Sequence, residues 1–130
     1  MGIDTEFFFY FTFVPVEDDT VSEAVFKKLE VWLKKQKLCW EVEDGGDEIR
    51  VSFNTSFRMD VKEVVENLAR LAKKLKSLKF GGSASAPYMS SWGDYESGVV
   101  YIDIFDEAIL IKVKGISCHG DENSFEKKLV

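Results

Sequence analysis

The chain has 130 residues, of which 45% are hydrophobic and 31% are charged, and its net charge is −6 at pH 7. This composition is typical of one globular domain over residues 1–130 and excludes a disordered chain, because it supplies enough apolar surface for a core. The acidic balance argues against a nucleic-acid partner, since binding to a polyanion depends on basic residues.

Positive charge is concentrated in two stretches of the sequence. Residues 20–37 hold five lysines against two glutamates, and residues 60–79 hold six basic residues against three acidic ones. Lysines in such numbers are typical of the solvent-facing sides and C-terminal ends of helices. A second interpretation is that the acidic remainder of the chain attracts a basic protein partner.

Residues 7–14, with the sequence FFFYFTFV, are predicted to form a central strand. The run is too short to cross a bilayer as a helix, and aromatic and β-branched residues favour the extended backbone. Because side chains alternate along a strand, Phe7, Phe9, Phe11 and Phe13 share one face. We expect that face to lie against the core and the strand to end at Pro15, which has no N–H to donate.

Two amphipathic helices are predicted to cover this strand. Thr20 and Glu23 match the capping box, and apolar residues then recur at helical spacing as far as Leu33. A second apolar stripe extends over residues 61–78, where the pair Gly81-Gly82 is expected to end the helix in the left-handed conformation.

Between the two helices, residues 38–43 and 48–53 alternate as two strands of a hairpin, with the glycine-containing turn at residues 44–47. Residues 54–59 are expected to connect the hairpin to the second helix. The order strand, helix, strand, strand, helix is the start of a ferredoxin-like arrangement.

After the second helix the pattern is less regular. Residues 83–89 are interpreted as an edge strand because they contain Pro87, and residues 99–105 and 109–113 as a C-terminal antiparallel hairpin. Residues 116–130 are expected to be a polar tail or a short terminal helix. The predicted fold is therefore an α+β two-layer sandwich with both helices on one face of the sheet.

The second face of that sheet is predicted to carry Phe8, Tyr10 and Thr12, beside Arg50 and Ser52. Exposed apolar patches of this size are uncommon on monomers, so we expect the C-terminal segment, a homodimer partner or curvature of the sheet to cover it. An RNA-binding surface is disfavoured, because the sequence has no glycine-aromatic octapeptide of the RNA-recognition type.

The predicted partner-binding segment is residues 88–98, YMSSWGDYESG. Aromatic residues in a loop beside serine and glycine suggest anchors for another protein, and the candidate residues are Tyr88, Trp92, Asp94, Tyr95 and Glu96. The alternative interpretation is that Trp92 and Tyr95 fold back to close one end of the core.

Candidates for catalysis or metal binding are few. The single histidine, His119, follows Cys118, but adjacent residues rarely face one another as nucleophile and base. A metal site would need a further ligand, and Cys39 is the only distant thiol. We therefore predict no cofactor, no metal and no enzymatic activity.

Together these features predict a small acidic cytoplasmic protein that binds another protein, as an immunity protein, antitoxin, inhibitor or adaptor does. The cytoplasmic location rests on the acidic N-terminal residues, which do not match a signal peptide. The alternative function is a regulatory domain that binds a small molecule in a pocket between the helices and residues 83–98. A third hypothesis, an enzyme built on Cys118 and His119, requires a reactive thiol.

Overall fold

The computed structural model describes residues 4–36, 41–58, 61–90, 96–106, 108–117, 120 and 122–129. Two helices and seven strands follow one another in the order β1 (Asp4–Pro15), α1 (Glu23–Lys34), β2 (Glu41–Asp44), β3 (Ile49–Arg58), α2 (Val61–Ser77), β4 (Phe80–Ser90), β5 (Glu96–Ile104), β6 (Ile109–Ser117) and β7 (Glu122–Leu129).

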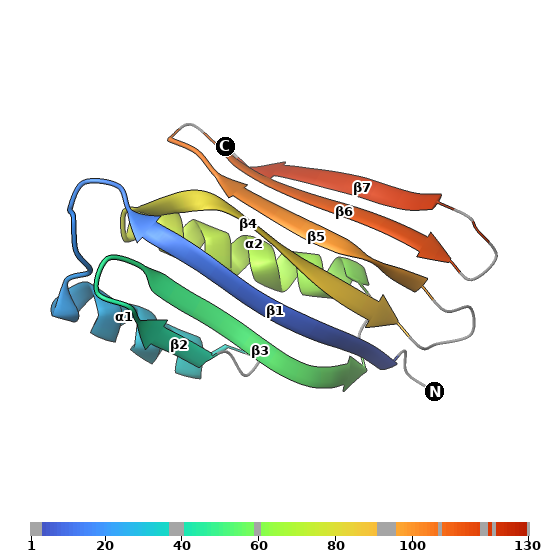
Figure 1. Cartoon of the computed structure of the whole chain (residues 1–130), viewed down its shortest axis with the longest axis horizontal. Helices are drawn as coiled ribbons and strands as arrows, with labels where there is room; N and C mark the ends of the chain where they lie inside the picture. The colour runs from blue at the N-terminus through green and yellow to red at the C-terminus, as the bar shows by residue number, and fades with distance from the viewer. Residues whose placement is uncertain are drawn as a thin grey trace.

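The seven strands form one open sheet in the order β2-β3-β1-β4-β5-β6-β7, in which every neighbouring pair is antiparallel. Both helices lie behind this sheet in the same view, and each contributes side chains to one buried cluster (Figure 1). The prediction of an α+β fold with two helices is confirmed. The second face of the sheet carries no helix in the described part of the chain.

The alternation predicted for β1 is confirmed where its side chains are described. Phe11 and Phe13 are 0% and 1% exposed, whereas Tyr10 and Val14, which flank this segment, are 58% and 48% exposed. The structure does not describe the side chains of Phe7 to Phe9. Phe11 and Phe13 therefore point to the helices, and burial of each large apolar side chain contributes about 1.5–3 kcal/mol.

The helices bury the apolar stripes that their spacing predicts. α1 buries Leu29 and Leu33. α2 buries residues three or four apart, namely Val65, Leu68, Leu71, Ala72 and Leu75. These positions lie on one side of a helix of 3.6 residues per turn, so they meet the same core as the inward residues of the strands.

The predicted capping box at the start of α1 is wrong. The helix begins at Glu23, after Ser22, and the Ser22 side chain makes no capping hydrogen bond. A tertiary contact explains the shift: the N–H of Val21 donates to the carbonyl of Gly46, 2.8 Å away in the β2–β3 turn. This bond keeps Val21 and Ser22 outside the helix, so the helix begins two residues later than predicted.

The predicted end of α2 is also corrected. Lys79, with φ of 67°, takes the left-handed conformation that the sequence assigned to Gly81-Gly82. The carbonyl of Lys79 accepts a hydrogen bond of 2.9 Å from the N–H of Val16, which fixes this turn against the end of β1. Gly81 and Gly82 consequently belong to β4 and not to the helix cap.

Two further segments differ from the prediction because of strand pairing. Residues 54–58, expected to be a connection, extend β3, and Arg58 pairs with Asp4 of β1. The strand containing Pro87 is not at an edge, since β4 lies between β1 and β5. Pro87 is opposite Val99 of β5, and the pairs that join β4 to β1 lie at the two ends of β1, on either side of the proline.

The C-terminal region contains the predicted hairpin and one additional strand. β5 and β6 pair in continuous register from Ile104–Ile109 onward, and the N–H of Phe105 donates to the carbonyl of Ala108 at 2.8 Å to close the turn. Residues 122–129, expected to be a polar tail or a short helix, form β7 beside β6. The free backbone groups of β6 explain this, because a strand satisfies them and a helix does not.

Candidate functional site

The structure places the predicted partner-binding residues in different environments. Tyr88 is 1% exposed and belongs to the core, so it is not a surface anchor. Its even position in β4 makes it face the helices together with Ala86 and Phe80. Trp92, Asp94 and Tyr95 lie outside the described residues, and Glu96 begins β5 with only its backbone described.

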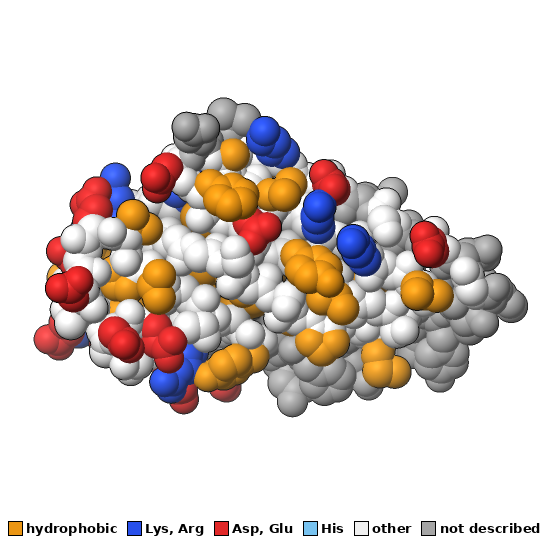
Figure 2. Space-filling view, turned by 45° about the horizontal axis from the view of Figure 1, so that its top comes forward, with side chains coloured by type: hydrophobic (Ala, Val, Ile, Leu, Met, Phe, Trp, Pro, Cys, Tyr) orange, Lys and Arg blue, Asp and Glu red, His pale blue; other side chains and the backbone are white. Residues whose placement is uncertain are grey.

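The surface that stands out instead is the face of the sheet opposite the helices, which we call the open face. Large apolar side chains on or beside it are between 37% and 58% exposed: Tyr10, Val14, Met89, Tyr101, Phe105 and Ile116. In the space-filling view, such side chains form separate groups between small polar and charged ones (Figure 2). Tyr10 was expected here from the sequence, but the side chain of Phe8 is not described.

Residues of β5 on this face were missed by the sequence analysis. Val100, Ile102 and Ile104 are buried, so the alternation of β5 sends Tyr101 to the open face. The same alternation in the sequence could have identified it.

The register of the sheet arranges the open face in rows across the strands. Tyr101 is opposite Ser85 of β4 on one side and Lys112 of β6 on the other. Lys112 is in turn opposite Glu126 of β7, and its Nζ lies 3.4 Å from Oε1 of Glu126. An exposed tyrosine thus has a small residue on one side and a paired charge on the other.

At the opposite side of the open face, Arg50 of β3 forms ion pairs with acidic neighbours. Its Nε donates to Oε1 of Glu48 at 3.1 Å, and its Nη1 lies 3.6 Å from Oε2 of Glu43 on β2. The hydrogen bond with Glu48, followed by the electrostatic influence of Tyr10, raises the pKa of Arg50 above its ordinary value. Because both carboxylates engage the guanidinium, it is poorly placed to recognise an external anion.

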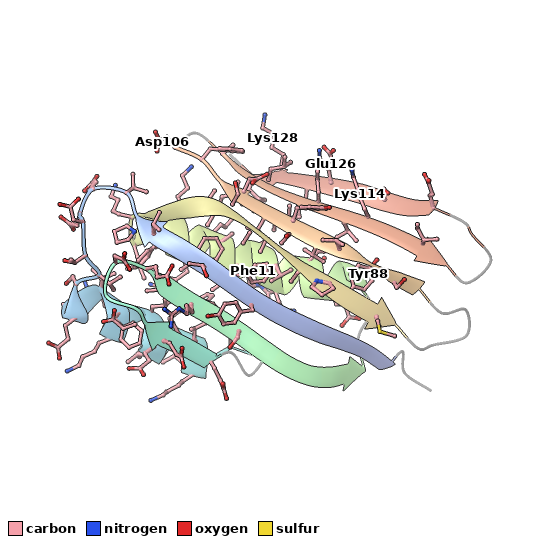
Figure 3. The ribbon with its side chains drawn as sticks, in the orientation of Figure 1. Phe11, Tyr88, Asp106, Lys114, Glu126 and Lys128 are labelled. Atoms are coloured by element: carbon pink, nitrogen blue, oxygen red, sulfur yellow. The ribbon has the colours of Figure 1, made fainter. Side chains whose placement is uncertain are left out.

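A groove of about 850 Å³ crosses one end of the open face. Its floor contains Gly81 and Gly82, and apolar walls are provided by Val14, Val16, Phe105 and Leu110. The charged residues along it are Asp106, Glu126 and Lys128, which Figure 3 shows along the border formed by β5, β6 and β7. Gly82 borders open space here, because a Cβ atom at this position would meet no other atom within 4 Å.

This groove is not the pocket that the sequence analysis expected between the helices and residues 83–98. Smaller hollows lie near the helices, including one beside Lys73, Ile109 and Leu129 and one between α1 and β2. Residues 83–90 do not line these two.

Cys118 and His119, on which the enzyme hypothesis depends, lie outside the described residues, and so does Cys39. Within the described ranges, His, Cys, Asp and Glu side chains form no group of three or more that could hold a metal ion. The feature that the described residues present is a surface of mixed apolar and polar character.

None of the helices in the described part of the chain is both long and apolar enough to cross a membrane. Comparisons with family models, with curated proteins and with solved structures find no match to this chain.

Proposed function

We propose that this chain is a non-catalytic protein that binds another protein through the open face of its sheet. The observation that carries the proposal is the exposure of large apolar side chains at several places on this face, with Tyr10 at 58%, Phe105 at 53% and Ile116 at 55% exposed. An antiparallel sheet can leave one face in water, but that face is then usually polar, so large apolar side chains on it favour a surface that a partner covers.

The chemistry of the face favours a protein partner. Tyr10 and Tyr101 supply large contact areas with few rotatable bonds, which is why tyrosine is common among the residues that dominate binding energy at interfaces. The cations Arg50 and Lys112 are each paired with a glutamate. The net charge of the chain, −6, also disfavours a phosphate backbone as the partner. Inhibitor, immunity, antitoxin and adaptor functions are all consistent with such a surface.

The groove supports a second candidate, a small-molecule-binding regulatory domain. Its volume of about 850 Å³ falls within the range of ligand pockets, and its walls are mainly apolar with a few charged groups. A ligand there would lie on the open face, against Gly81 and Phe105.

We also propose that β1 to β4 and the two helices constitute a ferredoxin-like unit to which β5, β6 and β7 are added. The support is the split β-α-β connection: β1 and β2 run parallel, with β3 between them and antiparallel to both. The complete order of seven strands goes beyond that unit, so this relationship concerns only part of the sheet.

The test begins with gentle purification from the native cells and native mass spectrometry of everything that stays bound. The affinity for the recovered partner is then compared for Tyr10→Ala/Tyr101→Ala and for Val31→Ala. Val31 is 54% exposed on α1, on the other side of the molecule, and is the matched control.

Removal of both tyrosines is expected to weaken binding at least about 30-fold, which corresponds to 2 kcal/mol, while Val31→Ala leaves it unchanged. A partner whose affinity is insensitive to the tyrosines would contradict the open-face proposal. A small adduct lost on substitution of Phe105 would favour the groove.

A further inference from the structure

Strand β7 forms one edge of the sheet and is eight residues long. An edge strand of this length presents a row of unpaired N–H and C=O groups, which is a template for another strand. The opposite edge is different: β2 has four residues, and Glu41, Glu43 and Asp44 make it strongly acidic. Repulsion between acidic side chains protects β2 from pairing with its own copy, whereas β7 contains both signs of charge.

The register of the sheet identifies which residues of β7 direct their backbone groups outward. The N–H of Phe105 donates to the carbonyl of Ala108, so these two residues, at the turn between β5 and β6, are a hydrogen-bonded pair. In an antiparallel ladder such pairs alternate, and the registers of β5–β6 and β6–β7 continue without a bulge. Odd-numbered residues of β6 therefore bond to β7, and in β7 the outward groups belong to Glu122, Ser124, Glu126 and Lys128.

A second copy of β7 can add to this edge around a two-fold axis when even-numbered residues face even-numbered residues. If the axis passes through position 125, Glu122 is opposite Lys128 of the second copy, and Ser124 is opposite Glu126 of the second copy. The two-fold symmetry generates each of these pairs twice. This register places unlike charges together at both ends of the contact.

The neighbouring registers place like charges together. An axis at position 124 sets Glu122 against Glu126, and an axis at position 126 sets Glu126 against itself. An axis at position 127 pairs Glu126 with Lys128, but it sets Lys127 against itself and shortens the overlap of the two strands to residues 125–129. A parallel pairing in register would align every charge with its own copy. Like charges directly opposite in a sheet are destabilising, so one register is favoured over its competitors.

We propose that two copies of this chain associate edge to edge through β7, with the axis at position 125. The two seven-stranded sheets then continue into one another. Glu122, Ser124, Glu126 and Lys128 are all exposed, and the even-numbered residues of both copies lie on the open face. The dimer therefore joins the two open faces into one surface and leaves the helices on the other side.

Backbone hydrogen bonds provide the association, and the charges select the register, because single exposed ion pairs contribute little. Sedimentation velocity from 1 to about 500 μM in low salt is expected to show a reversible monomer–dimer equilibrium. Raising the salt concentration to about 1 M shortens the Debye length to about 3 Å and should weaken the dimer several-fold.

Charge exchange tests the register. Glu122→Lys and Lys128→Glu are each expected to weaken self-association at least about tenfold, since each creates two like-charge pairs. The double variant, and an equimolar mixture of the two single variants, should recover it, because both combinations restore unlike pairs. Lys28→Glu makes the same charge change at an exposed lysine of α1, on the helix side of the sheet, and is the matched control.

A backbone test is independent of charge. Ser124→Pro removes an outward N–H and leaves the bonds between β6 and β7, so the monomer should keep its circular dichroism spectrum and thermal unfolding while the dimer is lost. Several results would overturn the proposal: a monomer at every concentration, open-ended polymers joining β7 to β2, or a dimer that survives Ser124→Pro and is lost in Tyr10→Ala. The last would show contact between open faces.

Discussion

Cε1 of Tyr88 lies 2.8 Å from the position that a Cβ atom would take on Gly98, its opposite residue in β5. The ring of Tyr88 thus occupies the space that the glycine leaves free, as aromatic residues do beside glycines in other sheets. The same hypothetical Cβ would lie 2.2 Å from the carbonyl oxygen of Lys114 and 2.8 Å from Cα of Gly115. Three adjacent strands therefore approach closely at this point, and Tyr88 closes the core over them.

Replacement of Gly98 by alanine is expected to destabilise the protein by about 1–3 kcal/mol or more, since the new methyl group meets backbone atoms that cannot easily move. Urea unfolding followed by circular dichroism measures the change. Ser97→Ala, an exposed neighbour on the same strand, should alter the free energy of unfolding by less than about 0.5 kcal/mol. Equal stability of the two variants would contradict the close approach of β5 and β6.

Tyr88 and Met89 are adjacent in sequence but lie on opposite faces of β4, with 1% and 47% exposure. Tyr88→Ala is expected to reduce the free energy of unfolding by about 3–5 kcal/mol through loss of burial and formation of a cavity. Met89→Ala should change it by less than about 0.5 kcal/mol. Chemical denaturation of both variants checks this. Unchanged stability of Tyr88→Ala would contradict the burial of Tyr88 and favour the original prediction that it binds a partner at the surface.

Lys79 holds the left-handed conformation with φ of 67°. Glycine adopts this conformation without the clash of a Cβ atom, so Lys79→Gly is expected to stabilise the protein by up to about 1 kcal/mol. Lys73→Gly, an exposed site inside α2, should instead destabilise it by about 1 kcal/mol. Thermal unfolding of the two variants separates these effects. The change in stability caused by replacing lysine with glycine should be positive at position 79 and negative at position 73 only if Lys79 has the left-handed conformation.

Ser22 precedes α1 but makes no side-chain capping bond. Ser22→Ala is therefore expected to lower the free energy of unfolding by less than about 0.5 kcal/mol, below the value of about 1 kcal/mol found where a serine caps a helix. Denaturant unfolding of the variant measures the effect. A loss of 1 kcal/mol or more would indicate that the side chain bonds to the first turn of the helix in solution.

Several features of this protein follow from its sequence alone, because they depend on local periodicity. The two-residue alternation of FFFYFTFV predicts the burial of Phe11 and Phe13, and the spacing of the leucines in α2 predicts its buried side. Asp44, Gly45 and Gly46 form the tight turn that their conformational freedom suggests, with the N–H of Gly46 donating to Oδ1 of Asp44 at 2.8 Å.

Other features were decided only by the tertiary structure. The residues of β4 are mostly small, and ENSFEKKL in β7 is mostly polar, so neither has a strong local preference for the strand. Both became strands because neighbouring strands had backbone groups to satisfy, and pairing then determined which way each side chain points. That pairing buried Tyr88, left Tyr101 exposed and made β7 an edge, because the position of a strand within a sheet depends on contacts between residues far apart in the chain.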